Sequence, residues 1–354
     1  MSPAEAFVRS LVVAGPPALP RDGEWPALPR DGEWPALPRD GEWPAVHAVL
    51  ADHRLAAWAW SRLCEAQADG SLPFDARARL FAAHAQASEA FEGLAEGTSR
   101  LLVALRAKSV DPIVLKGMAL ANLVYADPAA RPMADVDVLV RPGERGTVEA
   151  VLQALGYQHV ANEGDTDAYQ APGGLLLDLH HRFRLFEGHE LAALSRDAPA
   201  PFLDVDSIRV LAPDPMLAHL VHHLEGHRRV EGLLLAWILD IALVLRAWST
   251  GLDFDRVAML LGPSRARDGL PRLRGFCSHR LGAGAGEGLP DRWSFDAIVR
   301  TRCRAAWNMG TARGWAHAAA CWLGRSHPAD RPRLYAADLV HAPLDRLRDR
   351  FGLG

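Results

Sequence analysis

The segment MADVDVLV, at residues 133–140, restricts the possible folds of this chain more than any other. Its apolar residues predict a buried β-strand, and side chains on a strand alternate between the two faces of a sheet. Asp135 and Asp137 are therefore expected to point to one side, with Val136 and Val138 in the opposite core. Two neighbouring carboxylates at the end of a buried strand are costly unless a cation lies between them. The segment thus predicts a cation site on one face of a sheet.

The flanking sequence divides into helical, mixed and helical parts. Residues 45–110 follow a helical pattern that breaks at ADGSLPFD, which predicts two helices. Residues 111–212 alternate short strands and helices, and residues 213–354 are again helical in pattern. This order predicts an α+β fold in which helical segments flank a small mixed β-sheet.

Within the central part, four segments are expected to form strands: DPIVLKG, MADVDVLV, GGLLLDLHHRF and SIRVLAP. The short run DAYQ is expected to pair with GGLLLDLHHRF as a hairpin, with its turn at Gly173 and Gly174. The longest apolar stretch, residues 232–245, is shorter than a membrane span and contains Asp240. We expect a buried core helix there, and Asp240 then needs a partner, such as an arginine or His227.

Residues 1–44 contain the nonapeptide PALPRDGEW three times in succession. Two prolines and a glycine in nine residues do not suit a complete helix or strand, so we interpret the segment as a weakly ordered insert. Slippage of a duplicated segment accounts for the repeat, although its tryptophans Trp25, Trp34 and Trp43 could dock on a protein partner.

Charge and cysteine content narrow the range of partners and compartments. The net charge of -4 gives no general attraction to nucleic acid, and the four cysteines show no CxxC pairing. The N-terminus lacks the features of a signal peptide. A cytoplasmic protein with no membrane partner is expected.

Residues upstream and downstream of the DxD pair suggest what its cation is for. Hard cations such as Mg²⁺ take carboxylate oxygens together with substrate phosphates, and Asp178 on a neighbouring strand could complete a two-metal site. Lys116 and Gly117 stand where a strand opens directly into a helix, a geometry that favours an anion. Arg131 could add a bidentate phosphate contact.

The DxD spacing occurs at three other places in the chain. The pair Asp165 and Asp167 is expected in a polar loop, and the pair at residues 253 and 255 is expected at a helix start. Asp204 and Asp206 are the strongest alternative, because FLDVDSIRV is also strand-like.

The run VLKGMALANLVYADPAARPMADVDVLV, followed by ALGY and LDLHHRF, resembles the uncharacterised nucleotidyltransferase family of the DNA polymerase β-like superfamily. The resemblance extends from about residue 45 to about residue 248. It implies a polymerase β-like fold, with metal ions held by Asp135 and Asp137 and with Asp178 at the third acidic position. Where the superfamily commonly has a Gly-Ser pair, this chain has Lys116 and Gly117 followed by methionine.

The resemblance also implies an activity, the Mg²⁺-dependent transfer of a nucleoside monophosphate from an NTP to an acceptor hydroxyl. Two Mg²⁺ ions are expected, with Mn²⁺ as an alternative, and ATP is the first candidate for the NTP. The acceptor could be a small molecule, a peptide or a protein. Two alternatives stay open: a non-catalytic nucleotide- or partner-binding module of the same fold, and an RNA-modifying nucleotidyltransferase.

Histidines form a further group of candidate residues. His219, His223 and His227 are spaced by four and share one helix face, but such a row is too extended for one tetrahedral zinc ion. His223 and His227 resemble recurrent positions of the family and are expected to line an acceptor pocket. His180 shares a strand face with Asp178 and is expected either to orient it, to contact the acceptor, or to pack in the core.

Overall fold

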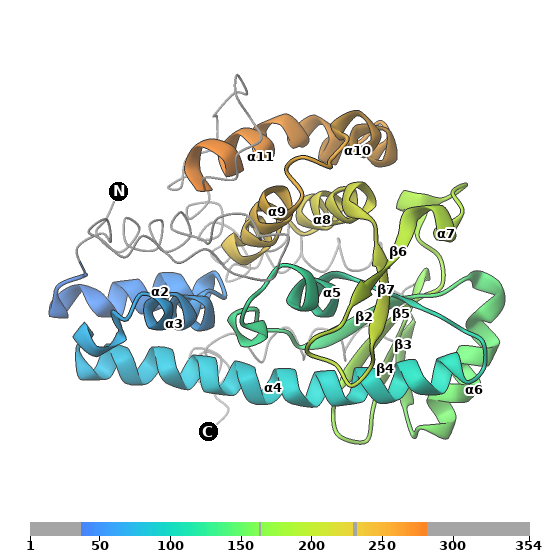
Figure 1. The fold of residues 1–354 in the computed structure, drawn as a ribbon, viewed down its shortest axis with the longest axis horizontal. Coiled ribbons are helices and arrows are strands. Elements are labelled where there is room, and N and C mark those ends of the chain that lie inside the picture. The colour runs from blue at the N-terminus through green and yellow to red at the C-terminus, as the bar shows by residue number, and fades with distance from the viewer. Residues whose placement is uncertain (1–36, 163, 229–231, 282–354) are drawn as a thin grey trace, which may run out of the picture.

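A seven-stranded mixed sheet forms the centre of the computed structural model, which describes residues 37–162, 164–228 and 232–281 (Figure 1). The strand order is β3-β4-β5-β2-β1-β7-β6. In chain order the strands are β1 (Ile113–Val114), β2 (Asp135–Leu139), β3 (Gln158–Asn162), β4 (Thr166–Gln170), β5 (Leu176–His180), β6 (Ser195–Pro199) and β7 (Ser207–Leu211). Strand β2 pairs parallel with β5 and antiparallel with β1. The predicted α+β fold with a mixed sheet is confirmed.

Helices cover both sides of this sheet. The 33-residue helix α4 (Phe74–Arg106) runs along one side with α6 (Arg145–Ala154), and α8 (Pro213–His227) and α9 (Leu235–Ala247) lie on the other side (Figure 1). The remaining α-helices of the described residues are α2 (Trp43–Asp52), α3 (Ala56–Glu65), α5 (Lys116–Leu123), α7 (Leu191–Leu194), α10 (Phe254–Leu261) and α11 (Arg265–Leu281). Val138 and Leu179 are fully buried on the side that faces α4 and α6. The opposite face of β2 and β5 is thereby left for polar side chains.

The N-terminal helical region contains three helices where two were expected. The predicted break at residues 68–75 is present, because a short 3-10 turn and Pro73 precede the first residue of α4. A second break separates α2 from α3, and there Arg54 adopts a positive φ of 55°. Neither glycine nor proline stands at this turn, so the sequence gives no local signal for it.

The last copy of the nonapeptide differs from the expected weakly ordered insert. Trp43, its final residue, is the first residue of α2 and is only 3% exposed. The Glu42 carboxylate accepts a hydrogen bond of 2.9 Å from the Arg39 backbone N–H and so closes the turn that precedes the helix. Burial of a large aromatic side chain stabilises this copy against the core. Trp25 and Trp34 lie outside the described residues.

Other sequence predictions correspond closely to observed elements. The β4–β5 hairpin is present, and Gly174 in its turn has a φ of +86°, a conformation that suits glycine. Helix α9 is the expected buried helix, and no described helix combines the length and apolarity that crossing a bilayer would need. Strands β3 and β6 were not predicted. Residues 282–354 of the expected C-terminal helical domain lie outside the described residues.

Candidate active site

Three carboxylates share one face of the sheet where β2 and β5 run side by side. In this parallel pair Asp137 stands directly opposite Asp178, and Asp135 lies two residues earlier on β2. Residues in register on adjacent strands, and residues two apart on one strand, point to the same face. The structure therefore brings together the three predicted acidic residues. Asp135 is exposed, Asp178 is half-buried and Asp137 is 5% exposed.

A lysine and a histidine hold the buried carboxylate. The Nζ atom of Lys116 lies 2.7 Å from Oδ1 of Asp137, and Nε2 of His180 lies 2.9 Å from the same oxygen. The Nδ1 atom of His180 is 3.0 Å from the Thr166 hydroxyl, which fixes the orientation of the ring. His180 thus orients Asp137, although the sequence had pointed to Asp178 as its neighbour.

The backbone conformation explains how Lys116 reaches this position. Lys116 is the first residue of α5, directly after β1, and has a φ of 37°. Residues other than glycine rarely adopt a positive φ, and such strain is concentrated at functional sites. The preceding backbone N–H, of Leu115, donates a hydrogen bond of 3.0 Å to the Asp137 carbonyl oxygen. Lys116 is thereby fixed beside β2.

The charges of this cluster shift the pKa values of its members in opposite directions. Burial disfavours the charged form of Asp137, but the contacts with Lys116 and His180 outweigh it and hold the pKa well below its usual range. The Asp135 side chain reaches solvent, but its partial desolvation by the surrounding elements and the neighbouring Asp137 raise its pKa. Burial works against the charge of Lys116, yet Asp137 raises the net pKa of its ammonium group. A cation is therefore favourable at the shared face.

Gly117 and Arg131 connect this site to helix α9. The Arg131 guanidinium donates from Nε and Nη2 to the two carboxylate oxygens of Asp240, each at 2.9 Å. The Tyr125 hydroxyl donates to the same carboxylate at 2.7 Å. The partner of Asp240 is thus an arginine, one of the two partners that the sequence predicted, the other being His227. A Cβ atom on Gly117 would lie 2.5 Å from Nη1 of Arg131, so the glycine allows the guanidinium to pack against the turn. The role of both residues in phosphate binding stays a prediction.

Aromatic rings lie next to the carboxylates on the α8 and α9 side. The rings of His223 and His227 have centroids 4.4 Å apart, and each contacts Trp237, at 5.0 and 5.2 Å. His219 packs on Phe183 instead, and neither of its ring nitrogens has a hydrogen-bond partner among the described residues. Burial, with a further contribution from Lys116, holds the pKa of His219 and His223 well below 6.5. The imidazoles of His219 and His223 are therefore neutral at physiological pH.

The competing DxD pairs lie elsewhere. Asp204 precedes β7 in an exposed turn, where its backbone N–H bonds to the Ser99 hydroxyl. Asp167 was expected in a loop, but it lies in β4. Its side chain is fully buried on the opposite face of the sheet, where Nη2 of Arg145 lies 2.9 Å from Oδ2 of Asp167. Asp253 begins α10, as expected, by accepting hydrogen bonds from two backbone N–H groups. Asp167 is paired with Leu179, next to Asp178 in β5, and so points to the other face of the sheet.

The donor set suits a hard divalent cation by its chemistry. Within the described ranges, no three His, Cys, Asp or Glu side chains form a ready-made metal cluster. Asp135, Asp137 and Asp178 nevertheless offer carboxylate oxygens from one face, the ligand type that Mg²⁺ and Mn²⁺ take. A metal ion bound there would compete with Lys116 for Asp137.

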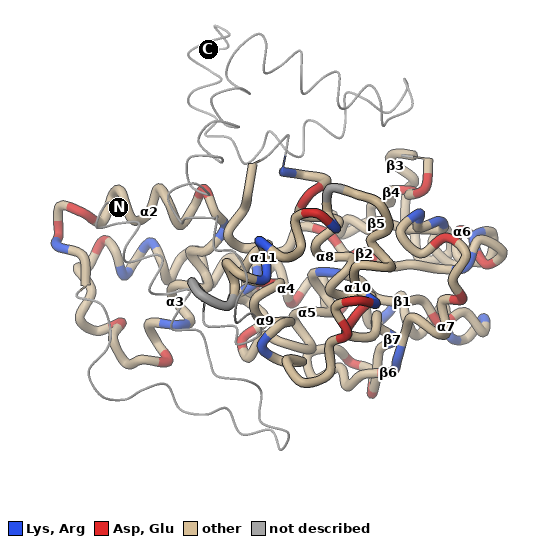
Figure 2. The backbone as a smooth tube through the Cα atoms, turned by 90° about the horizontal axis from the view of Figure 1, so that it is seen from above, with Lys and Arg blue, Asp and Glu red and all other residues tan. Residues whose placement is uncertain are grey.

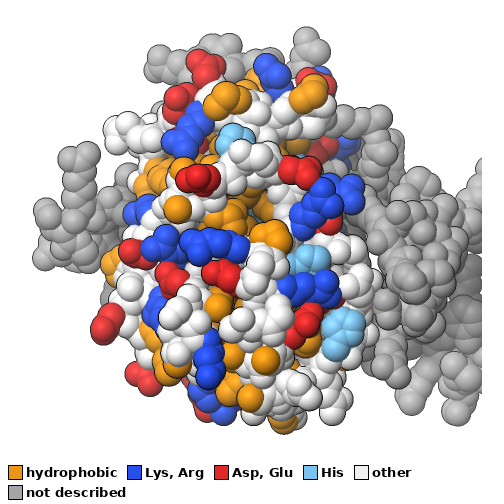
Figure 3. All heavy atoms as spheres, turned by 90° about the vertical axis from the view of Figure 1, so that its right-hand side faces the viewer, with side chains coloured by type: hydrophobic (Ala, Val, Ile, Leu, Met, Phe, Trp, Pro, Cys, Tyr) orange, Lys and Arg blue, Asp and Glu red, His pale blue; other side chains and the backbone are white. Residues whose placement is uncertain are grey.

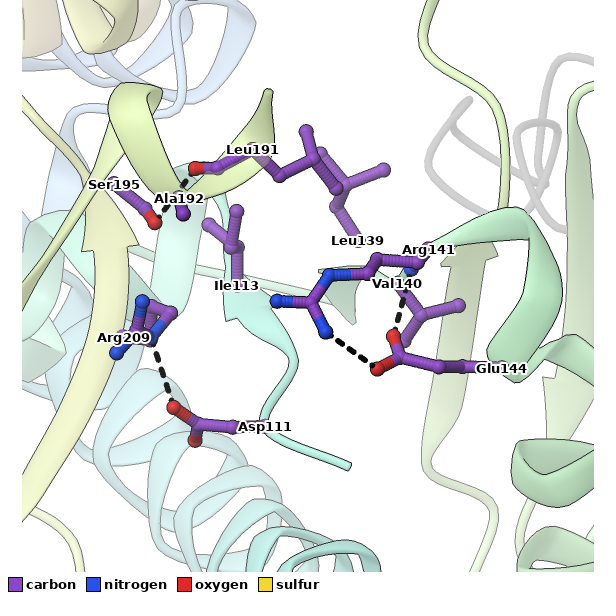
Figure 4. A pocket seen from close by; sticks show the side chains of 10 residues that line it. All are labelled: Asp111, Ile113, Leu139, Val140, Arg141, Glu144, Leu191, Ala192, Ser195 and Arg209. Atoms are coloured by element: carbon purple, nitrogen blue, oxygen red, sulfur yellow. Dashed lines mark hydrogen bonds and ion pairs between the residues drawn. The ribbon is translucent and has the colours of Figure 1, made fainter. Parts of the chain in front are cut away.

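A small surface depression lies at the other end of β2. Its lining includes Leu139, Arg141 and Arg209, and its charged side chains are paired, as in the 2.8 Å contact between Arg209 and Asp111 (Figure 4). Figure 3 shows apolar side chains in a shallow hollow between charged ones on the side of the molecule where α6 and α7 lie. Acidic and basic residues are interspersed along the described backbone, including α6 (Figure 2). Neither the depression nor this surface groups like-charged side chains as β2 and β5 group their three carboxylates.

A match to a protein-family model gives the class of this protein. The model of the uncharacterised nucleotidyltransferase family matches residues 39–282, and the chain belongs to this family. A search of the curated proteins gave no match.

A search of the solved structures found partial similarity to two proteins, the antibiotic-resistance factor ANT(2'')-Ia and a nucleotidyltransferase-like protein. The solution structure of the antibiotic-resistance factor ANT(2'')-Ia is 17% identical, with a TM-score of 0.37, covering 48% of this chain and 90% of that one. The crystal structure of ANT(2'')-Ia with adenylyl-2''-tobramycin has the same identity and TM-score, covering 48% and 94%. An antigenic nucleotidyltransferase-like protein from Paracoccidioides brasiliensis is 17% identical, with a TM-score of 0.37, covering 56% and 95%.

Two residues at this site were not identified from the sequence. Thr166 holds His180 from the neighbouring strand β4, and Tyr125 joins the pair of Arg131 and Asp240. The Thr166 contact depends on the β4–β5 register, which the sequence does not determine by itself. The sequence does single out Tyr125 in one respect, because it is the one aromatic residue within the run from LKG to DVD.

Proposed function

We propose that this nucleotidyltransferase transfers a nucleoside monophosphate from an NTP, with ATP as the first candidate, to a hydroxyl group, in a Mg²⁺-dependent reaction. The observation that supports the proposal most is the in-register pairing of Asp137 with Asp178, with Asp135 on the same face. Carboxylates on adjacent strands that share a face can hold divalent cations together with substrate phosphates.

In this proposal each residue has a distinct task. Asp135 and Asp137 would bind the metal ions, which supply charge neutralisation at the phosphates when bound. Asp178 would accept the proton of the acceptor hydroxyl. The hydroxyl oxygen of the acceptor would form the new bond to the α-phosphorus as the bond to the leaving pyrophosphate breaks. Lys116 and the turn at Gly117 would bind the triphosphate, and Arg131 would keep that turn in place.

The aromatic group beside the site is the proposed acceptor end. His223, His227 and Trp237 form a half-buried aromatic surface, and burial together with the nearby Lys116 lowers the pKa of His223. Such a surface suits a hydroxyl-bearing acceptor with a flat or apolar portion. The acceptor itself remains open among small molecules, peptides and proteins.

The test is transfer of label from α-labelled ATP, with Mg²⁺, to a metabolite extract or a lysate. Asp137→Asn should reduce the labelling at least about a hundredfold, because it removes a ligand charge on which the transition state depends. Asp204→Asn is the matched control, since Asp204 belongs to an exposed DxD pair away from the site, and it should label as the wild type does. Full labelling by a folded Asp137→Asn protein would refute the proposal.

A further inference from the structure

One carboxylate oxygen of the proposed metal site is already contacted by two side chains of the protein itself. Oδ1 of Asp137 is contacted by Nζ of Lys116 at 2.7 Å and by Nε2 of His180 at 2.9 Å. A carboxylate oxygen offers about two lone-pair positions, so both positions of this oxygen are used. A metal ion can bind Oδ1 only when one of the two donors leaves.

Of the two donors, Lys116 is the one that a metal ion would displace. An ammonium group and a divalent cation that contact one oxygen repel each other strongly in a buried site. His180 is held from its other nitrogen by Thr166 and lies within β5, whereas Lys116 reaches Asp137 through a flexible four-carbon stem. The Lys116 side chain is 18% exposed, so its ammonium group has a route away from Asp137.

The backbone conformation at residue 116 does not favour lysine, so the charge of Lys116 needs an explanation of its own. Lys116 stands at a φ of 37°, a conformation that glycine would adopt more readily. Gly117, directly after it, is packed against Arg131 and cannot supply a charge. Two lysines occur in the whole chain, and the other one, Lys108, is exposed after helix α4.

We propose that Lys116 is a resident cation that competes with the divalent metal for Asp137 and moves to the nucleotide phosphates when the metal enters. The inference rests on the proposed metal site. It implies that metal alone binds weakly, because it must displace Lys116, and that the nucleotide strengthens metal binding by providing a new partner for the ammonium group. Metal and nucleotide thus bind with positive coupling.

The experiment measures Mn²⁺ binding to the nucleotide-free protein by calorimetry or by electron paramagnetic resonance. Lys116→Met removes the competing charge and should bind Mn²⁺ at least about tenfold more tightly than the wild type. Lys116→Gly should give the same sign with less risk to folding, because glycine tolerates the positive φ. Lys108→Met, which removes the exposed lysine, is the matched control and should bind Mn²⁺ as the wild type does.

A second measurement separates this role from simple phosphate binding. With ATP present, the gain in Mn²⁺ affinity that ATP confers on the wild type should shrink by a similar factor in Lys116→Met. Equal or weaker Mn²⁺ affinity in both Lys116→Met and Lys116→Gly would overturn the inference while the metal site stands. Absence of any Asp137-dependent Mn²⁺ binding, in the wild type and in all variants, would overturn the metal site itself and the inference with it.

Discussion

Replacing Asp240 by asparagine would remove the charge that anchors Arg131 beside the active site. Asp240 is 2% exposed on α9, and its carboxylate receives two hydrogen bonds from Arg131 and one from Tyr125. The variant leaves the buried guanidinium opposite a neutral amide. Unlike a surface pair, this contact lies where water cannot compensate for the lost charge.

The expected magnitude follows from these contacts. Each hydrogen bond to a charged group contributes about 1.5–3 kcal/mol, and removing one partner of a buried ion pair costs about 3–5 kcal/mol. Asparagine retains one oxygen acceptor, so we expect Asp240→Asn to lower the free energy of unfolding by about 3 kcal/mol. Tyr125→Phe, which removes a single hydrogen bond to the same charged group, should cost about 1.5–3 kcal/mol.

Urea denaturation followed by circular dichroism would measure these values. Glu96→Gln is the matched control, because Glu96 and Arg100 form an exposed pair on α4 at 3.6 Å, and its effect should stay below about 0.5 kcal/mol. An Asp240→Asn protein that unfolds within about 1 kcal/mol of the wild type would refute the argument that this pair joins α9 to the site.

Three further substitutions test other parts of the structure. Gly117→Ala should lower the free energy of unfolding by about 1–3 kcal/mol, because its Cβ would lie 2.5 Å from Nη1 of Arg131; an unchanged midpoint in urea would contradict this packing. Trp43→Ala should cost about 3–5 kcal/mol, measured in the same way, since the side chain is 3% exposed. Partial desolvation and Asp137 raise the pKa of Asp135, so its charge disfavours the metal-free fold at pH 7. Asp135→Asn should therefore raise the melting temperature in EDTA at pH 7, and the gain should disappear as the pH falls below 3.8, where the carboxyl of the wild type is protonated in the folded and the unfolded protein alike; a lower melting temperature at pH 7 would contradict the sign.

Local pattern was sufficient to predict which side chains of a strand share a face. The alternation in β2 places Asp135 and Asp137 on one face and the buried Val136 and Val138 on the other. Local pattern does not determine that Asp178 lies beside Asp137, because the pairing of β2 with β5 joins two residues that are 41 positions apart in the sequence. Short-range periodicity contains no information about that register.

The features that the sequence did not predict depend on contacts between distant residues. The charge of Asp240 inside an apolar helix demanded a partner, but the choice of Arg131 follows only from the packing of α9 against the turn before β2. Strands β3 and β6 have the mixed composition of edge strands, whose outer sides need no apolar partner. The positive φ of Lys116 has no local sign at all, since glycine follows it rather than occupying its place.

The anchoring of the last nonapeptide by Trp43 has a consequence for how this chain can vary in length. Each copy is followed by Pro-Ala, so the stretch that leads into α2 reads the same whichever copy stands directly before Val46. Gain or loss of a whole unit ahead of it would leave the helix entry chemically identical. Replication slippage in steps of nine residues would therefore keep the sequence that enters α2 unchanged, and related chains should differ in repeat number more freely than in the residues after the final tryptophan.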